Sequence, residues 1–516
     1  MTRYISAFVS LAVTLTIVSV SLFWATEPAG ASNITVNTTV DELNANGNCT
    51  LREAIQSANT DSAIDACTAG SGDDVIDLPA GTYIMSIAGS GEDSNATGDF
   101  DITSNLAING AAAGTTIVDG DDLDRVFDIF TINGPLTVTI AGLTVTNGGD
   151  LGSEDGGGIA NDETLTLSGV IVTSNDGDDG GGIDNDGDLT INDSTISNNT
   201  TSDADDGGGI RNLGTLEINR STIIGNEADT DGGGGISNLE GEATLSNVTV
   251  SGNSTAGAGG GISNNGELNL NNVTIAGNSA TLGGGGLADG QVILKSVREI
   301  EPGEGDYFVS AGTSDGTARV AALGITGVTA TNTIVASNPT GGDCLVEDLT
   351  SSGHNLDGDN TCTFDQTTDK PGVDPQLAAL ADNGGPTQTR AIPATSPATD
   401  AGDPATCLAE DQRGFGFARP QDGNNDGTAV CDIGAYEREA AGPTPGGPTT
   451  TPNSLAPSGG GSGAGAGASG PSALPGTGGS RSSAGGEIAT ASSFLVIVGI
   501  SLTMIYALRA RSKSHR

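Results

Sequence analysis

The sequence predicts an all-β fold, a right-handed parallel β-helix, and two observations carry that prediction. The first is a repeated block, Gly-Gly-Gly-Ile-x-Asn, whose successive copies lie 24 to 27 residues apart (183 − 159 = 24 and 210 − 183 = 27). The second is a pair of short segments with alternating Ile, Val, Leu and Thr after each block, as at 165–167 and 170–172. Alternation with a period of two is typical of strands and not of helices. The apolar residue of the block falls at Ile159, Ile183, Ile210, Ile236 and Ile262, and a variant ends in Leu287.

The length of the repeat selects the β-helix among repeat architectures. Three short strands in about 25 residues fit one coil, whereas a propeller blade needs about 40 residues and a leucine-rich repeat has a different consensus. One coil cannot bury its inward side chains alone, so neighbouring coils must stack, about 4.8 Å apart. We expect an asparagine near the end of each coil to stack at one corner and to tolerate left-handed backbone. These residues are Asn175, Asn198, Asn226, Asn253 and Asn278.

Composition excludes several classes of protein. The 516 residues include 65 acidic and 18 basic side chains, for a net charge of -47. That excess excludes a nucleic-acid partner and docking to anionic lipid by charge. The 82 glycines lack a triplet period, which excludes collagen, and a hydrophobic fraction of 35% is too high for a fully disordered chain. Extracellular scaffolds, cation binders and surface proteins remain.

The two ends of the chain predict export and anchoring. Arg3 precedes an apolar run at 5–24 and the small residues 29–31, a layout typical of a signal peptide at 1–31, with an uncleaved anchor as the alternative. The stretch 488–508 has no charged residue and is long enough to cross a bilayer as a transmembrane helix. The basic tail 509–516 then lies in the cytoplasm. We therefore expect an extracellular protein held at the envelope by its C-terminus.

A short motif lies just upstream of this span, within a disordered, flexible stalk rich in Gly, Ser, Pro and Thr at 439–487. The motif resembles the LPxTG sorting signal of sortase substrates, in which motif, apolar span and basic tail follow in that order. The resemblance implies cleavage by sortase and covalent attachment to the envelope. The alternative is a turn-rich linker that matches the motif by chance. Its residues are Leu474, Pro475, Gly476, Thr477 and Gly478.

The segment Cys-Thr-Leu-Arg-Glu-Ala-Ile at 49–55 predicts a helical cap on the first coil. Thr50 and Glu53 have the spacing of a capping box, and Leu51, Ile55 and Ala58 share one helix face. The segment resembles the CSLREA motif that opens many bacterial surface β-helix proteins, with Thr50 in place of serine. We assign 32–100 to the N-terminal cap and first coils, and 101–345 to the β-helix.

The region 346–438 is similar to the choice-of-anchor Q domain. The similarity rests on segments such as Gly-His-Asn-Leu at 353–356, Asp-Gln-Arg-Gly at 411–414, Arg-Pro at 419–420 and Cys-Asp-Ile-Gly-Ala-Tyr-Glu at 431–437. That family carries interchangeable C-terminal anchors, which agrees with the stalk and the span. Together the two resemblances imply a pectin-lyase-like solenoid without a single assigned activity.

The six cysteines form three local pairs along the sequence. An even number in an exported chain favours disulfides, although six cysteines formally allow 15 connectivities. No Cys-x-x-Cys spacing exists, which disfavours a zinc site. The pairs lie outside the repeat, where they can clamp the caps: Cys49 with Cys67, Cys344 with Cys362, and Cys407 with Cys431.

Calcium is the one cofactor that the sequence suggests. Asp422, Asn424 and Asp426 match the first half of an EF-hand loop, but Ile433 stands where the closing glutamate would be, so Asp432 or Glu437 would have to complete the shell. The alternative is an ordinary Asp/Asn/Gly loop. An acidic residue also precedes the glycine run on four successive coils, and stacking would align these carboxylates into an acidic ladder, which either bridges cations or is a solvated turn. The ladder comprises Asp155, Asp179, Asp206 and Asp231.

We expect a surface protein for adhesion or glycan binding, with an extracellular glycan or a surface protein as its partner. The alternative is a polysaccharide lyase or glycoside hydrolase, because related folds host such enzymes. A lyase would need a basic residue near the acids, and Arg211 is the best candidate for that base. An ion pair with neighbouring aspartates is the simpler interpretation of Arg211. We therefore favour binding over catalysis. The segment 295–317 interrupts the repeat and predicts a surface loop.

Overall fold

A computed structural model describes residues 30–131, 134–149, 155–201, 206–229, 232–289 and 327–440, and the short segments 292–294, 308–310 and 318–321. The chain divides into two units, Met1–Pro445 and Gly446–Arg516, and every described residue belongs to the first. Nearly all of the predicted signal peptide, and the sorting motif, the membrane span and the basic tail, lie outside the described residues. Within the described ranges no helix combines the length and the apolar character that crossing a bilayer requires.

The N-terminal cap contains the helix α2 (Leu51–Thr60), and its predicted capping box is confirmed. The Thr50 side chain accepts a hydrogen bond from the Glu53 backbone N–H, and the Glu53 carboxylate accepts one from the Thr50 N–H. Leu51 and Ile55 on the buried face pack against the first coil. The helix therefore covers core side chains that would otherwise be exposed at the end of the stack.

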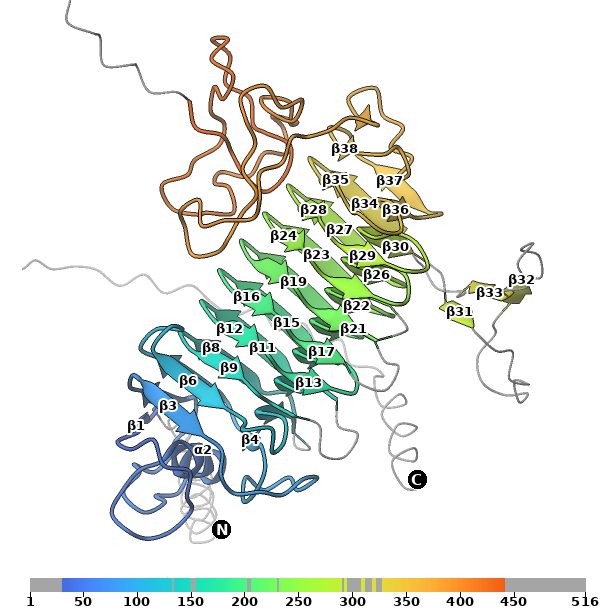
Figure 1. Cartoon of the computed structure of the whole chain (residues 1–516). Coiled ribbons are helices and arrows are strands. Elements are labelled where there is room, and N and C mark those ends of the chain that lie inside the picture. The colour runs from blue at the N-terminus through green and yellow to red at the C-terminus, as the bar shows by residue number, and fades with distance from the viewer. Residues whose placement is uncertain are drawn as a thin grey trace, which may run out of the picture. The chain divides into compact units, whose positions relative to one another are not determined.

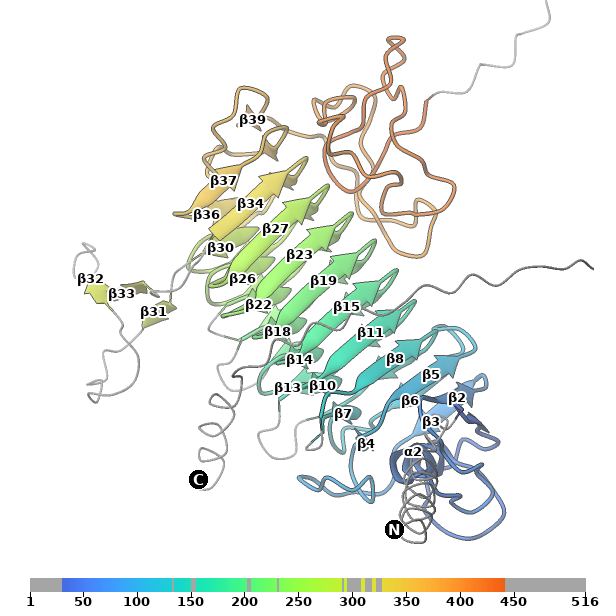
Figure 2. The same ribbon diagram turned by 180° about the vertical axis from the view of Figure 1, so that it is seen from behind.

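Three long parallel sheets form the walls of the stack (Figures 1 and 2). Sheet 1 contains β1 (Asn33–Thr35), β2 (Asp74–Leu78), β5 (Leu106–Gly110), β8 (Thr137–Ala141), β11 (Thr164–Ser168), β15 (Asp188–Asn192), β19 (Thr215–Asn219), β23 (Glu242–Ser246), β27 (Glu267–Asn271), β34 (Gly327–Thr331) and β37 (Leu349–Ser351). Sheet 2 contains β3 (Gly81–Ile84), β6 (Thr116–Asp119), β9 (Thr144–Thr146), β12 (Ile171–Thr173), β16 (Thr195–Ser197), β20 (Thr222–Ile224), β24 (Thr249–Ser251), β28 (Thr274–Ala276), β35 (Ile334–Ala336), β38 (Leu356–Asp357) and β39 (Lys370–Pro371). Sheet 3 contains β4 (Phe100–Ile102), β7 (Phe127–Ile129), β10 (Ile159–Asn161), β14 (Ile183–Asn185), β18 (Ile210–Asn212), β22 (Ile236–Asn238), β26 (Ile262–Asn264), β30 (Leu287–Asp289) and β36 (Cys344–Leu345).

Two smaller sheets complete the described strands. Sheet 4 is parallel and contains β13 (Asp176–Gly177), β17 (Thr200–Thr201), β21 (Glu227–Ala228), β25 (Ser254–Thr255) and β29 (Ser279–Ala280). The antiparallel strands β31 (Val292–Leu294), β32 (Phe308–Ser310) and β33 (Ala318–Ala321) form sheet 5, within and beside the predicted insertion at 295–317. Stacked strands also occur on both sides of the range 101–345 that we assigned to the β-helix.

Equivalent residues of successive coils pair in register, which confirms the stacking of the repeat. Ile159 pairs with Ile183, Ile183 with Ile210, and Ile210 with Ile236, all between parallel strands. These isoleucines are fully buried, so each coil contributes the same apolar residue to one continuous core. Parallel strands in stacked sheets are consistent with the predicted right-handed β-helix, since nearly all parallel crossovers have that hand.

Two ladders of buried asparagines run through the stack. In the first Asn ladder each side-chain amide donates to the next side-chain oxygen at 2.9–3.2 Å, through Asn175, Asn199, Asn226, Asn253, Asn278 and Asn338. Our choice of Asn198 was wrong, because Val172 pairs with Ile196 and this register aligns Asn199 with Asn175. Asn198 instead adopts left-handed backbone, with φ 53°. The second ladder was not predicted as a ladder and comes from the repeated block itself: Asn161, Asn185, Asn212, Asn238 and Asn264.

Glycine is required at different positions of the repeated block for different structural reasons. Gly180 has φ +61°, a conformation that glycine adopts without strain. A Cβ on Gly182 would lie 2.7 Å from Asn199 Nδ2 of the first Asn ladder and 2.6 Å from the Gly209 carbonyl oxygen. The sharp turn and the close approach to the ladder thus explain why the repeat needs a run of glycines.

The C-terminal region 372–440 contacts the side of the coils through buried hydrogen bonds. Gln412 accepts a hydrogen bond from Thr249 Oγ1 and donates to Thr222 Oγ1 at 2.9 Å. The Gly434 N–H donates to the Asn332 carbonyl at 2.8 Å. The three predicted disulfides are all confirmed: Cys49–Cys67, Cys344–Cys362 and Cys407–Cys431.

Candidate functional site

In the eight three-residue strands of sheet 3, the central residue lies on the side of the sheet opposite the core. Its two neighbours in the strand, such as Phe127 and Ile129 around Asp128, belong to the buried core. Because strands of this sheet pair in register, the central residues line up from coil to coil, about 4.8 Å apart. This central column consists of Asp101, Asp128, Ala160, Asp184, Arg211, Ser237, Ser263 and Ala288.

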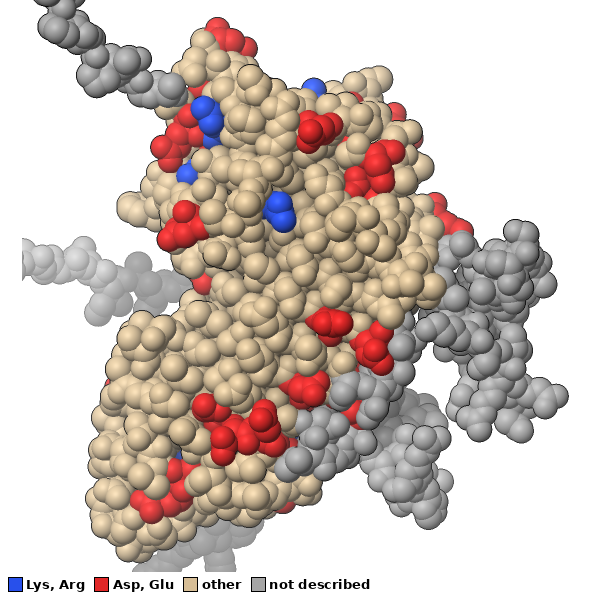
Figure 3. Space-filling model, in the orientation of Figure 1, with Lys and Arg blue, Asp and Glu red and all other residues tan. Residues whose placement is uncertain are grey.

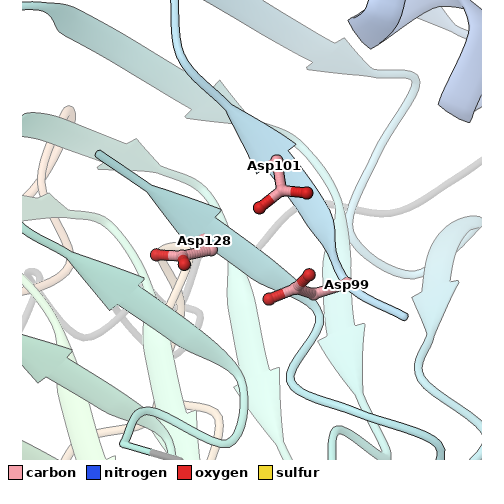
Figure 4. Close-up of side chains that lie close together, drawn as sticks. All are labelled: Asp99, Asp101 and Asp128. Atoms are coloured by element: carbon pink, nitrogen blue, oxygen red, sulfur yellow. The ribbon is translucent and has the colours of Figure 1, made fainter. Parts of the chain in front are cut away.

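The first acidic centre lies at the N-terminal end of this column and comprises Asp99, Asp101 and Asp128 (Figure 4). Asp101 is on β4, Asp128 is on β7, and Asp99 directly precedes β4. One carboxylate oxygen from each of the three residues lies within 4.8 Å of the others. Arg125 Nε donates to Asp99 Oδ2 at 2.8 Å, and its guanidinium lies 3.8 Å from Asp128 Oδ2.

Burial strongly raises the pKa of two carboxyl groups of this centre, those of Asp99 and Asp101. Desolvation raises the pKa of Asp99 to about 9, and the nearby Asp101 adds to the rise while Arg125 opposes it. Desolvation likewise raises the pKa of Asp101 to about 7, against the hydrogen bond from the Asn95 N–H. Ionised carboxylates at this location are therefore costly unless a cation accompanies them.

The second acidic centre surrounds Arg211, two strands further along the column from Ala160. Its guanidinium lies 2.9 Å from Asp184 Oδ1, 3.3 Å from Asp179 Oδ2 and 3.9 Å from Asp155 Oδ2. Burial alone would lower the pKa of Arg211, but the attraction of Asp184 and Asp179 outweighs it and the pKa is raised. Arg211 is thus held as a cation in an ion-pair network. This arrangement argues against the catalytic base that we considered for it.

The predicted acidic ladder is present in the described residues. The Gly156 N–H donates to the Asp179 carbonyl at 2.7 Å, and the Gly180 N–H donates to the Asp206 carbonyl at 3.0 Å. Asp155, Asp179 and Asp206 therefore follow one another on successive coils, while Asp231 lies outside the described residues. Cation bridging along this ladder stays a prediction.

A third feature is an acidic groove where the chain turns from sheet 3 into sheet 1. Its cavity of about 220 Å³ is formed by turns of successive coils. Four carboxylates line it, from Asp162, Glu163, Asp186 and Asp188. The remaining lining residues are Pro135, Thr164, Gly187, Gly214 and Thr215. On the face of the molecule drawn in Figure 3, acidic side chains form patches on a largely uncharged surface with few basic groups.

The predicted calcium loop lies in the C-terminal region. Asp422 accepts hydrogen bonds from the Asp426 and Gly427 amides, both at 3.0 Å, and Asn424 accepts one from the Asp426 amide at 2.8 Å. Asp432 is buried and accepts from the Asp400 and Arg438 amides. These contacts suit a hydrogen-bonded turn as well as half of a metal shell, so calcium binding there stays a prediction.

The first acidic centre and the groove were not found from the sequence. One signal was available for the centre, because Phe-Asp-Ile occurs at 100–102 and again at 127–129. Two identical strands in adjacent coils place two aspartates side by side. Asp99 could not be anticipated in the same way, since it belongs to the turn before the strand.

Comparisons with known proteins identify no family for this chain. No family model matches the chain, and no curated protein matches it. Among solved structures, the chain is similar to a pectate lyase, Pel9A, with 15% sequence identity and a TM-score of 0.38. The alignment covers 79% of this chain and 96% of that one. Similarity at this level carries no argument about activity, and the resemblances to the CSLREA and choice-of-anchor Q families stay predictions.

Proposed function

We propose that this chain is an exported, envelope-anchored β-helix that binds an extracellular glycan of neutral sugars or amino sugars. The observation that supports the proposal is the acidic groove, lined by Asp162, Glu163, Asp186 and Asp188. The groove lies on stacked coils that hold its side chains in a fixed geometry. Binding groups on a rigid scaffold lose little freedom when a ligand arrives.

The chemistry of the groove suits sugar hydroxyls. An ionised carboxylate accepts hydrogen bonds through two oxygens, and such charge-assisted bonds are stronger than neutral ones. The carboxylates come from two adjacent coils, about 4.8 Å apart, so neighbouring sugars of an extended chain can each meet an acceptor. Thr164 and Thr215 add hydroxyl groups at the rim.

Charge selects among glycans. Four carboxylates in the groove and a net charge of -47 repel a polyuronate, unless cations bridge the two. The same charges attract the ammonium groups of amino sugars. The groove thus favours neutral and amino-sugar polymers over the anionic polymers on which uronate lyases act.

The alternative is a polysaccharide lyase or glycoside hydrolase. Its main candidate residue, Arg211, is engaged by three carboxylates. A binding protein leaves the glycan intact, whereas an enzyme shortens it. Product analysis during a binding assay therefore separates the two functions.

The test uses the full-length chain, purified in detergent and immobilised. We expect it to bind chitosan oligomers or a neutral β-glucan more tightly than polygalacturonate, with no change in polymer length. The double variant Asp186→Asn/Asp188→Asn should weaken binding by about tenfold or more, because it removes two charged acceptors. Glu217→Gln, an exposed acid on β19 outside the groove, is the matched control. Equal glycan binding by the double variant and the control would contradict binding in the groove. Cleavage of the glycan would contradict a pure binding role.

Envelope anchoring has its own test. We expect the mature protein to remain attached to cell-wall fragments after detergent extraction, through the motif 474–478. Complete extraction by detergent would contradict sortase attachment and would favour retention by the apolar span alone.

A further inference from the structure

We propose that the first acidic centre binds a Ca²⁺ ion through the carboxylates of Asp99, Asp101 and Asp128. This site differs from the predicted calcium loop at 422–427 and does not depend on the proposed glycan binding. It would hold the N-terminal cap to the first two coils of sheet 3.

The spacing of the three carboxylates fits a calcium ion. Calcium is coordinated by oxygen atoms at about 2.3–2.6 Å, so two ligand atoms on opposite sides of the ion are about 4.8 Å apart. One oxygen from each residue lies within 4.8 Å of the other two. Two of the three residues are on paired strands, where Asp101 is the register partner of Asp128. The distance between these two ligands is therefore set by the sheet.

An independent observation at the same location points to a missing partner. Asp101 is fully buried, and its Oδ1 accepts no hydrogen bond from any described residue. Its other oxygen accepts one from the Asn95 N–H at 2.5 Å. A buried carboxylate oxygen without a partner is costly. A cation in contact with Oδ1 would satisfy it.

The local charge also fits a divalent cation. Three ionised carboxylates carry three negative charges, and the Arg125 guanidinium supplies one positive charge at 2.8 Å from Asp99. These four groups leave two negative charges, and Asp124, Glu92 and Asp93 add to the negative charge nearby, so a divalent cation would lower the repulsion. The second acidic centre differs in its pairing, because the Arg211 guanidinium lies within 4 Å of all three carboxylates, whereas Arg125 forms ion pairs with Asp99 and Asp128.

The position of the site couples the ion to the cap. The Arg52 guanidinium of α2 donates to the carbonyls of Gly98 and Asp99, at 2.7 and 2.9 Å. Asp99 therefore links α2 through its carbonyl to the proposed ion through its carboxylate. We expect calcium to stabilise the N-terminal end of the stack.

The test compares three proteins at full length in detergent, first in EDTA and then in a Ca²⁺ titration. For the wild type we expect a higher midpoint of thermal unfolding with calcium. Asp101→Asn should weaken calcium binding about tenfold or more and remove this shift, since the ion loses a charged ligand. Without calcium the same variant should unfold at the same temperature as the wild type or higher, because a crowded carboxylate is gone. Asp184→Asn, the buried aspartate of the second centre, should keep the wild-type calcium response.

The outcome separates this site from other acidic groups. Calorimetry should show one site fewer in Asp101→Asn than in Asp184→Asn. An unchanged titration and an unchanged thermal shift in Asp101→Asn would overturn the proposal, as would a wild type that does not respond to calcium. Asp128→Asn provides a second variant in case Asp101→Asn fails to fold. Glycan binding in EDTA is expected to persist, so failure of one proposal does not imply failure of the other.

Discussion

The first Asn ladder makes a sharp prediction for Asn226→Ala. The Asn226 Oδ1 accepts from the backbone N–H and the side-chain amide of Asn199, both at 3.0 Å. Its Nδ2 donates to Asn253 Oδ1 at 3.0 Å and to the Ile196 carbonyl at 3.1 Å. Alanine removes all four bonds inside a fully buried corner. The orphaned Asn199 N–H costs about 1–3 kcal/mol, and the three other bonds about 0.5–1.5 kcal/mol each, so we expect a loss of about 3–7 kcal/mol.

The assay has a global and a local part. Urea unfolding compares Asn226→Ala with Asn269→Ala, a half-buried residue of β27 whose side chain makes one contact of 3.4 Å with Glu267. Because a solenoid is stabilised mainly between neighbouring coils, native-state hydrogen exchange should also show faster exchange of the Asn199 amide than in the control. Equal unfolding midpoints for the two variants, with unchanged protection at Asn199, would refute the structural role of the ladder.

Three further predictions concern other parts of the chain. Burial raises the pKa of Asp184 to about 7. Between about pH 4 and pH 7 the folded protein therefore keeps a proton on Asp184 that the unfolded chain has lost. The free energy of unfolding consequently falls as the pH rises through that range. In urea titrations, the free energy of unfolding of Asp184→Asn should therefore rise relative to that of the wild type as the pH is raised from 4 to 8. A difference in free energy between the two proteins that does not change with pH would contradict this prediction. Thr50→Ala should lower the free energy of unfolding by about 1–2 kcal/mol, since it removes the cap of α2, whereas the exposed Thr60→Ala should change it little. Asp422→Ala should remove one calcium site in calorimetry if the loop binds calcium, and identical titrations would exclude that site.

The architecture could be predicted because every coil repeats the same constraints. Ile159 and its equivalents recur with the block, and a residue that is buried in one coil is buried in the next. Asn198 was predicted in place of its neighbour Asn199, at a point where two asparagines follow each other in the sequence. Counting from the apolar strand, where Val172 pairs with Ile196, gives the correct residue. Local geometry is thus read more safely from the strands than from the turns.

The candidate sites were harder to predict because they combine residues that do not repeat. The capping box at Thr50 and the local disulfides depend on short separations and were predicted correctly. In contrast, Asp99 enters the first acidic centre only through the turn before β4, and its partner Arg125 comes from the next coil. The groove depends on how four turns lie beside one another, and the sequence contains no direct signal of that shape.

The charges of the central column are arranged so that repulsion stays local. Two ionised carboxylates on adjacent coils, about 4.8 Å apart, repel by about 3.5 kcal/mol at an effective dielectric constant of 20. An uninterrupted column of aspartates would accumulate this cost at every coil. Ala160 instead separates Asp128 from Asp184, and each acidic centre has its own arginine, Arg125 or Arg211. In the second centre Arg211 forms ion pairs with all three carboxylates, whereas in the first centre Arg125 forms ion pairs with Asp99 and Asp128, and a buried oxygen of Asp101 has no hydrogen-bond partner among the described residues. The same sheet therefore holds one centre in which an arginine of the chain pairs with every carboxylate, and one in which we propose that a cation from the surroundings contacts the remaining carboxylate oxygen.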